Sequence, residues 1–261
     1  MSNQMDECLS IQLLVVQSRR HGLNSFSYEV RAVAFVDVLG FRQLVHSSSA
    51  NACCMNRLSH LVRTLQELVK RLDLKVDRKT VPVHLIPRHN QISDSIVLSA
   101  PLRSDEPKWR NYNGLEILAM RVCQITHVLL DEGYLVSGGI DVGDVWHTDT
   151  NVVGPAYQNA YALETVVGHP CVQLSVAAAE IAKPIQQLNR LIVNYDGRTM
   201  VNGLFDAYIQ KPRGTINQTY EDYRSIIDSN VNLLSGSARD KWIWFGDALK
   251  AESKIVTGIS I

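Results

Sequence analysis

RAVAFVDVLGFRQL, residues 31–44, has the composition of a buried strand with a carboxylate near its end. Five apolar residues precede Asp37, and the apolar run continues after it as far as Gly40. Burying an unpaired carboxylate is costly unless something cationic meets it. We therefore expect Asp37 to face a cation, and the rest of the sequence indicates which kind.

Composition narrows the class of protein. The chain has 261 residues, 46% of them hydrophobic and 20% charged, which is typical of a soluble globular protein with a real core. Its 26 basic and 26 acidic residues balance, so no overall field draws it to nucleic acid or to an anionic membrane. The five cysteines show no CxxC spacing and predict neither a disulfide framework nor a zinc site. The early apolar run at 11–16 is too short for a signal peptide or a membrane span, so we expect a cytoplasmic protein.

Hydrophobic periodicity predicts the order strand, helix, strand, strand, helix, strand. The expected elements are a strand from 30 that turns at Gly40, a helix over 58–72, strands at 81–86 and 92–98 joined by a turn at 87–90, a helix over 115–130, a strand over 133–146, a helix over 154–166 and a short strand at 171–175. This order is the split βαβ, ferredoxin-like arrangement, an α+β fold with an antiparallel sheet and both helices on one face.

The C-terminal part has a different pattern. Residues 220–234 and 238–250 are expected to be helical. We therefore divide the chain into a domain of residues 1–180 and a mainly helical extension, 181–261, packed on the same unit.

A second carboxylate falls near Asp37 in this fold, whose first and third strands are neighbours. Asp94 in QISDSIVLS stands early in the third strand, so antiparallel pairing can place it a few ångströms from Asp37. Two buried like charges repel unless a proton or a cation lies between them. Oxygen ligands favour Mg²⁺ or Mn²⁺, and two such ions can activate a hydroxyl and stabilise a leaving phosphate. A turn cap or an arginine partner is the alternative role for each aspartate.

The turn after Asp37 fits the same chemistry. Gly40 permits a tight turn, and the backbone amides of Leu39, Gly40, Phe41 and Arg42, at the start of the next helix, can cradle a triphosphate.

Four motifs in sequence order extend this interpretation: FVDVLGF (35–41), SDSIVLS (93–99), VSGGIDVGDVW (136–146) and GPAYQNAYALE (154–164). Together they resemble the class III nucleotidyl cyclases over about residues 31–175, and most of all the bacterial pyrimidine cyclases of the Pycsar anti-phage system. The resemblance implies a homodimer with composite sites. It also implies two divalent cations, Mn²⁺ or Mg²⁺, held by Asp37, Asp94 and the Val38 carbonyl.

The implied reaction converts UTP to 3′,5′-cyclic UMP and pyrophosphate, as a second messenger in anti-phage defence. CTP to cyclic CMP is the alternative. Purine cyclases place a base-contacting lysine where this chain has Asn90, whose amide can serve either pyrimidine.

The chain also departs from the family in the helix over 154–164. Where the family has N-x-x-x-R, the alignment gives Gln158 and Ala162, with Asn159 as a neighbouring candidate for the catalytic asparagine. The transition-state arginine therefore has no counterpart in this motif. Its replacement is left open among three residues, Arg42, Arg103 and Arg121.

Other functions compete with the cyclase. A catalytically inactive, nucleotide-binding regulatory domain would lose the family's arginine and lysine, but it would have no reason to keep two repelling aspartates. A polymerase-like palm predicts a basic track, which the net charge of zero disfavours. Asp141 and Asp144 are assigned a structural or dimer-contact role, and His147 is interpreted as a surface or interface histidine.

Overall fold

The protein is built on one open, mostly antiparallel β-sheet. The computed structural model describes residues 26–73, 80–188, 190–211, 214–259 and 261. The strands in these ranges are β1 (Glu29–Val38), β2 (Arg88–Ile92), β3 (Ser95–Pro101), β4 (Val136–His147), β5 (Val152–Val153), β6 (Val172–Leu174), β7 (Ile192–Tyr195) and β8 (Arg198–Val201). The helices and 3₁₀ turns are α2 (Phe41–Ser48), α3 (Ala52–Asp73), η1 (Val83–Leu85), η2 (Pro107–Trp109), α4 (Gly114–Asp131), α5 (Pro155–Val167), α6 (Val176–Leu188), η3 (Asp206–Tyr208), α7 (Ile216–Leu233) and α8 (Gly236–Thr257).

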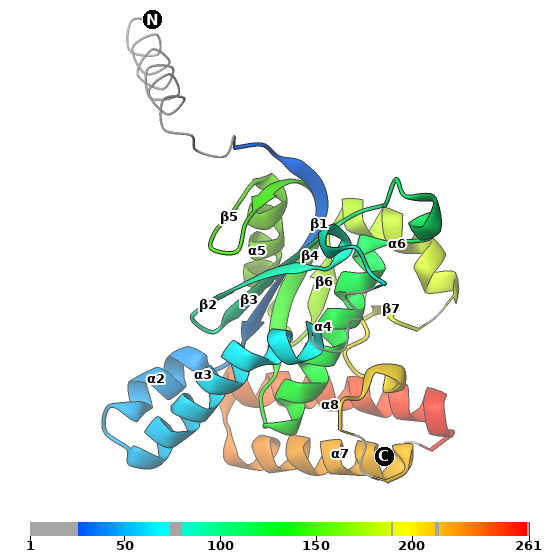
Figure 1. The fold of residues 1–261 in the computed structure, drawn as a ribbon. Helices are drawn as coiled ribbons and strands as arrows, with labels where there is room; N and C mark the ends of the chain where they lie inside the picture. Colours follow the sequence, from blue (N-terminus) through cyan, green and yellow to red (C-terminus); the bar gives the residue numbers. More distant parts are fainter. Residues whose placement is uncertain (1–25, 74–79, 189, 212–213, 260) are drawn as a thin grey trace, which may run out of the picture.

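The strand order confirms the ferredoxin-like prediction. β1 lies between β3 and β4 and is antiparallel to both, and β2 pairs with β3. The resulting order, β2-β3-β1-β4, is the split βαβ topology with α3 and α4 as its two crossover helices. β6 then extends the sheet in parallel with β4, and β8 and β7 complete it (Figure 1).

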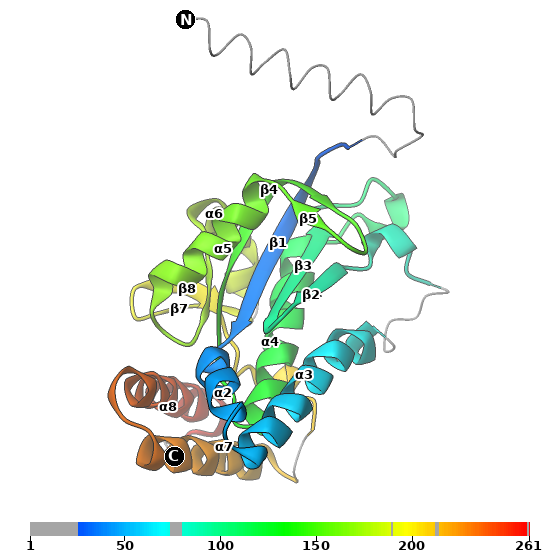
Figure 2. The same ribbon diagram turned by 90° about the vertical axis from the view of Figure 1, so that its left-hand side faces the viewer.

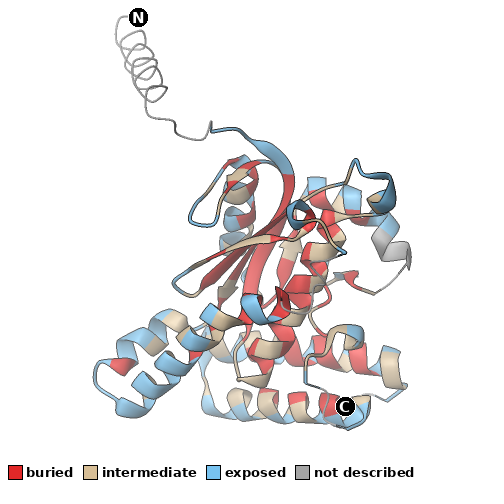
Figure 3. Cartoon of the chain, viewed as in Figure 1, coloured by how far each residue is buried: buried red, intermediate tan, exposed pale blue. Residues whose placement is uncertain are grey.

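The two faces of β1 are covered by different helices. Ala32, Ala34 and Val36 belong to the main core together with buried side chains of α3 and α4, so these two helices share one face as expected. Val33 and Phe35 point the other way and pack against α5, which covers part of the opposite face. Figure 3 shows that burial is concentrated in the sheet and the helices against it.

Glycines in β4 allow close packing of backbone. A Cβ at Gly139 would lie 2.4 Å from the carbonyl oxygen of Ala160, and a Cβ at Gly138 would lie 2.0 Å from that of Phe35. The glycine pair in VSGGIDVGDVW therefore lets α5 and β1 approach β4.

The hairpin differs from the sequence prediction. The segment expected as a strand at 81–86 contains the short turn η1, and the predicted turn at 87–90 is largely strand β2. The tight turn instead falls at 93–94, where Ser93 has a φ of 58°. Polar residues form β2 because Arg88 and Asn90 donate hydrogen bonds to backbone carbonyls of the β4–β5 hairpin.

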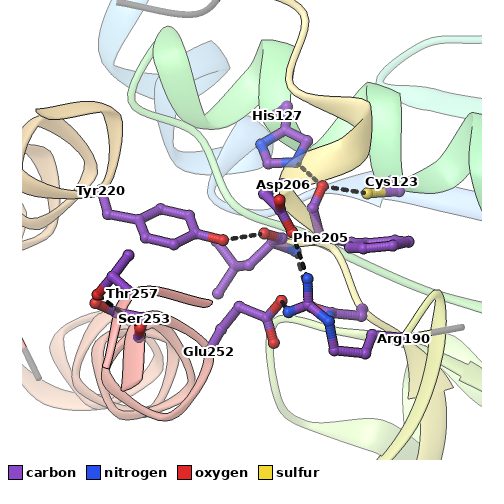
Figure 4. A network of polar contacts seen from close by, with 11 residues as sticks. Cys123, His127, Arg190, Phe205, Asp206, Tyr220, Glu252, Ser253 and Thr257 are labelled. Atoms are coloured by element: carbon purple, nitrogen blue, oxygen red, sulfur yellow. Dashed lines mark hydrogen bonds and ion pairs between the residues drawn. The ribbon is translucent and has the colours of Figure 1, made fainter. Parts of the chain in front are cut away.

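The C-terminal helices lie beneath the end of β1. α7 and α8 pack side by side there, next to α2, as both ribbon views show (Figures 1 and 2). Their shared apolar cluster includes Tyr220, Tyr223, Trp242 and Phe245 and reaches Leu135, the residue before β4. Arg190 bridges Asp206 and Glu252 and so ties α8 to the segment after β8 (Figure 4).

The apolar run at 11–16 lies outside the described residues. Within the ranges that the structure describes, no helix has the length and apolar character needed to cross a bilayer.

Candidate active site

The candidate site begins at the end of β1. Asp37 is half-buried, and it stands opposite Ser95 in the β1–β3 register. The Ser95 hydroxyl Oγ donates a hydrogen bond to Asp37 Oδ1 at 2.6 Å. Asp94, the residue before Ser95, occupies the β2–β3 turn rather than the strand in which the sequence placed it.

Burial and two nearby negative charges raise the pKa of Asp37. Burial is the largest cause, and the neighbouring charges of Asp94 and Glu164 add to it. The Ser95 hydrogen bond and the positive charge of Lys241 act in the opposite direction, and the pKa of Asp37 settles at about 6. The carboxylate at the end of β1 therefore lies in a field that favours an added positive charge.

Glu164 is a site residue that the sequence interpretation missed. Ser137, which faces Asp37 from β4, donates a hydrogen bond from its Oγ to Glu164 Oε1 at 3.0 Å. This bond directs the carboxylate from α5 toward the Asp37 end of the sheet. The signal was present in the sequence, because Glu164 ends the GPAYQNAYALE motif.

The carboxylates do not form a closed metal cage. In the part of the chain that the structure describes, no group of three or more histidine, cysteine, aspartate or glutamate side chains is arranged to hold an ion. The oxygens offered by Asp37, Asp94 and the Val38 carbonyl are hard donors, which suit Mg²⁺ or Mn²⁺. An ion at this site would complete its coordination with substrate or water oxygens.

The turn after β1 leads directly into α2. Gly40 occupies the N-cap position with a φ of 84°, and no side chain caps the helix. The first backbone N–H groups of α2 therefore have no side-chain acceptor, and they carry the positive end of the helix dipole. Phe41 packs against the main core, while Arg42 is exposed.

Asn90 is engaged inside the protein. It is buried on β2, where its Nδ2 donates to the Asp149 carbonyl at 2.8 Å and its Oδ1 contacts His147 Nε2. His147 Nδ1 is 2.7 Å from Ser99 Oγ, which accepts a hydrogen bond from Arg31 Nε at 3.0 Å. Because the Asn90 amide oxygen can only accept, His147 must carry its proton on Nε2, and the Ser99 hydroxyl then donates to Nδ1 of the neutral ring.

This network corrects the interpretation of His147. Its side chain is 1% exposed, so it is neither a surface nor an interface residue in this chain. Burial, aided by the charges of Arg31, Arg88 and His89, lowers the pKa of His147 to about 3. The histidine is therefore a neutral member of a buried network that fastens the β4–β5 hairpin over β2.

The predicted α5 residues lie away from Asp37. Gln158 and Asn159 are exposed, and Asn159 Nδ2 donates to Asp141 Oδ2 at 2.9 Å. Asp141 pairs with Val33, four residues before Asp37, so Asn159 lies roughly 13 Å along the sheet from the Asp37 level. One chain thus brings Asp37 and Asp94 together but does not bring Asn159 to them.

Asp141 itself has the structural role assigned to it. It is buried and accepts hydrogen bonds from Asn159 and from Ser175 Oγ, whereas Asp144 is exposed. The two aspartates therefore do not share a site.

The three candidate arginines occupy different places. Arg121 is buried against the main core and forms an ion pair with Asp73 at 3.0 Å. Arg103 follows β3 at the end of that strand remote from Ser95. Of the three, only Arg42 lies at the Asp37 end of the sheet.

The chain shows distant similarity to several solved structures. No protein-family model matches the chain, and no curated protein sequence matches it. An adenylate/guanylate cyclase/hydrolase from Silicibacter pomeroyi is similar with a TM-score of 0.36 and 13% identity, over 67% of this chain and 94% of that one. A class III adenylyl cyclase-like ATP-binding protein from Pseudomonas aeruginosa is similar with a TM-score of 0.41 and 12% identity, over 88% of this chain and 44% of that one.

Proposed function

We propose that the protein is a metal-dependent nucleotidyl cyclase. The observation that carries the proposal is the proximity of two carboxylates: the charge of Asp94 acts on Asp37 at the end of the central strand, directly before a glycine turn into an uncapped helix. The carboxylates suit divalent cations, and the uncapped amides suit the phosphates of a nucleotide. The four motifs that resemble class III cyclases imply a catalytic role for these same residues.

The reaction needs little covalent chemistry from the protein. The ribose 3′-oxygen forms a bond to the α-phosphorus, the bond from the α-phosphorus to the bridging oxygen breaks, and pyrophosphate leaves in line. The hydroxyl proton passes to water. Bound cations would lower the pKa of the hydroxyl and neutralise the developing charge. The chain's own contribution is to hold the α-phosphate beside Asp37 and Asp94 and the outer phosphates against the amides of residues 39–42.

We propose a homodimer in which each site uses both copies. The placement of Asn159 at the Asp141 level, remote from Asp37 in the same chain, supports this arrangement. Tyr161 and Val166 on α5 are 50% and 80% exposed, so this helix offers an apolar surface to a second copy. Gln158 or Asn159 of one copy would then complete the site around Asp37 of the other.

For the substrate we propose UTP, giving cyclic UMP as a messenger in anti-phage defence, with CTP as the alternative. Two features support this choice. The motifs resemble those of pyrimidine cyclases, and the chain has Asn90 where purine cyclases have a base-contacting lysine. Asn90 would have to exchange its bonds to His147 and Asp149 for bonds to a base. Its role in base choice is thus a separate question from the reaction itself.

The test is an incubation with ATP, GTP, CTP and UTP at equal concentrations with Mn²⁺, followed by detection of cyclic monophosphates and pyrophosphate. Asp37→Asn and Asp94→Asn should abolish turnover. Asp105→Asn, a carboxylate change at an exposed position of the loop after β3, is the matched control and should retain it. Near wild-type activity in either site variant would refute the metal pair. Cyclic AMP as the main product would refute the choice of base.

An inactive nucleotide-binding domain is the second candidate. Ala162 is exposed on α5 where the resembling family carries its arginine, and this favours a loss of catalysis. The same incubation separates the two functions. UTP binding that depends on Asp37, without cyclic product or pyrophosphate, would support the regulatory domain.

A further inference from the structure

A pocket of about 470 Å³ opens beneath the end of β1, next to the candidate site. We call it the α2–α8 pocket. α2, the start of α3, the α4–β4 turn and the turn between α7 and α8 form its walls. Its lining includes Leu39 and Gly40, two residues of the turn that follows Asp37. The volume is in the range of small-molecule sites in proteins.

The charged side chains that line this pocket are all positive. It contains two cationic side chains, Arg57 and Lys241, and no aspartate or glutamate. The guanidinium of Arg57 lies over the ring of Tyr134, 5.8 Å from its centroid. The residues three and four positions away from Arg57 and from Lys241 along their helices are all without negative charge, so neither has an acidic partner on its own helix.

Lys241 differs in this respect from another lysine of the same helix. Lys250 lies 3.7 Å from the Asp247 carboxylate. Within the described residues no such acid pairs with Lys241 at 4 Å or less, and its side chain is half-buried in the pocket wall. A half-buried ammonium without a carboxylate partner is suited to an anionic ligand.

The pocket is close to Asp37 both in charge interaction and along the chain. The charge of Lys241 is among the influences that act on the Asp37 carboxylate, and Leu39, two residues after Asp37, is fixed by a hydrogen bond from its N–H to the Leu135 carbonyl at 2.9 Å. The uncapped start of α2 lies between the carboxylates and the pocket along the chain. A triphosphate whose α-phosphate lies beside Asp37 can therefore extend past Gly40, so that its outer phosphates approach Arg57 and Lys241.

We propose that the α2–α8 pocket holds the outer phosphates of the nucleotide, with Lys241 and Arg57 as positioning residues for the leaving pyrophosphate. The inference rests on the proposed cyclase function and assigns α8 a part in its active site. Negative charge accumulates on pyrophosphate as the bridging bond breaks, and fixed cations stabilise that charge. α8 is held rigidly for this task by buried Trp242 in the helix core and by the Arg190–Glu252 ion pair (Figure 4).

Calorimetric titration with inorganic pyrophosphate, in the absence of divalent cations, tests the subsite directly. We expect Lys241→Gln and Arg57→Gln each to weaken pyrophosphate binding by about tenfold, as loss of one charge-assisted hydrogen bond does. Lys250→Gln on α8 and Arg63→Gln on α3 are the matched controls and should bind as the wild type does. Lys241→Arg should recover most of the affinity, because it restores the charge. Far-ultraviolet circular dichroism checks that each variant is folded.

Steady-state kinetics with the best nucleotide adds a second readout. Lys241→Gln should raise KM and lower kcat, since the lysine contacts the phosphates both before and during bond breaking. Wild-type protein that binds no pyrophosphate, or Lys241 and Arg57 variants that bind it as the wild type does, would overturn the subsite.

The two proposals can fail separately. If Asp37→Asn abolishes cyclisation while Lys241→Gln leaves kinetics and pyrophosphate affinity unchanged, the cyclase function holds and the subsite is wrong. If no nucleotide is cyclised but pyrophosphate binding depends on Lys241, the subsite holds as a polyphosphate site and the cyclase function is wrong.

Discussion

Ser95 holds Asp37 through a hydrogen bond of 2.6 Å between two neighbouring strands. The donor belongs to the residue directly after Asp94, so one contact fixes the first carboxylate and sets its place relative to the second. Because the bond stabilises the ionised form of Asp37, it partly offsets the rise in pKa that burial and Asp94 cause.

Replacing Ser95 by alanine should therefore raise the pKa of Asp37 above its present value of about 6. If ionised Asp37 is needed for cation binding, the acidic limb of the kcat/KM profile should move to higher pH by about one unit. Ser225→Ala, on the outer surface of α7, serves as the control. An unchanged acidic limb in Ser95→Ala would mean that Asp37 does not control the profile.

Asp37→Asn should stabilise the metal-free protein at high pH. The pKa of Asp37 is about 6 in the folded state against an ordinary 3.8, so the folded state binds more protons between these values and loses stability as pH rises through them. At pH 8, with EDTA present, the variant should gain about 1–2 kcal/mol in free energy of unfolding, after allowance for solvent screening.

At pH 4 Asp37 is already protonated in the folded state. The difference in free energy of unfolding between Asp37→Asn and the wild type should therefore be close to zero at this pH. Urea unfolding at both pH values measures it, with Asp105→Asn as the control. A gain of equal size at both pH values would show that the charge of Asp37 is not its cause.

The His147 network should make the protein sensitive to acid. The pKa of this histidine is about 3 in the folded state against 6.5 ordinarily, so the unfolded state binds more protons between these values. Stability should therefore fall as pH drops from 6.5 toward 3, by about 2–4 kcal/mol from this group. His147→Gln should flatten the fall, whereas exposed His46→Gln should leave it unchanged. Equal slopes in wild type and His147→Gln would contradict a buried neutral histidine.

Asn90→Ala distinguishes the structural role of this side chain from a role in selecting the base. Removing the amide leaves His147 Nε2 and the Asp149 carbonyl without their partner, so the free energy of unfolding should fall by about 1–3 kcal/mol. The ratio of kcat/KM for UTP and CTP, measured on the folded fraction, reports the second role. A changed ratio would assign Asn90 to the base as well, and unchanged stability would rule out the network.

Mixing two inactive variants tests the composite dimer. One carries Asp37→Asn, and the other carries Gln158→Ala with Asn159→Ala. After subunit exchange, half of the dimers are mixed and each has one intact site, so about a quarter of wild-type activity should return. No recovery in a mixture whose exchange is verified by native mass spectrometry would place the whole site in one subunit.

The sequence by itself determined the central part of the fold. The continuous apolar run at 32–36 and the helical periodicity of 58–72 and 115–130 predicted β1, α3 and α4, which are three elements of the ferredoxin-like core. Such patterns are local, because burial of one face requires apolar residues at fixed spacing, and so they can be recognised without the tertiary structure.

Only the tertiary structure decided the hairpin and the surroundings of Asp37. Arg88 and Asn90 form a strand because their side chains meet carbonyls of the β4–β5 hairpin, about sixty residues away in sequence. Glu164 and Lys241 act on Asp37 from helices that follow it by more than a hundred residues. Electrostatic interactions act through space and leave no periodic trace in the chain, so the charges around the site became visible only when the helices were packed against the sheet.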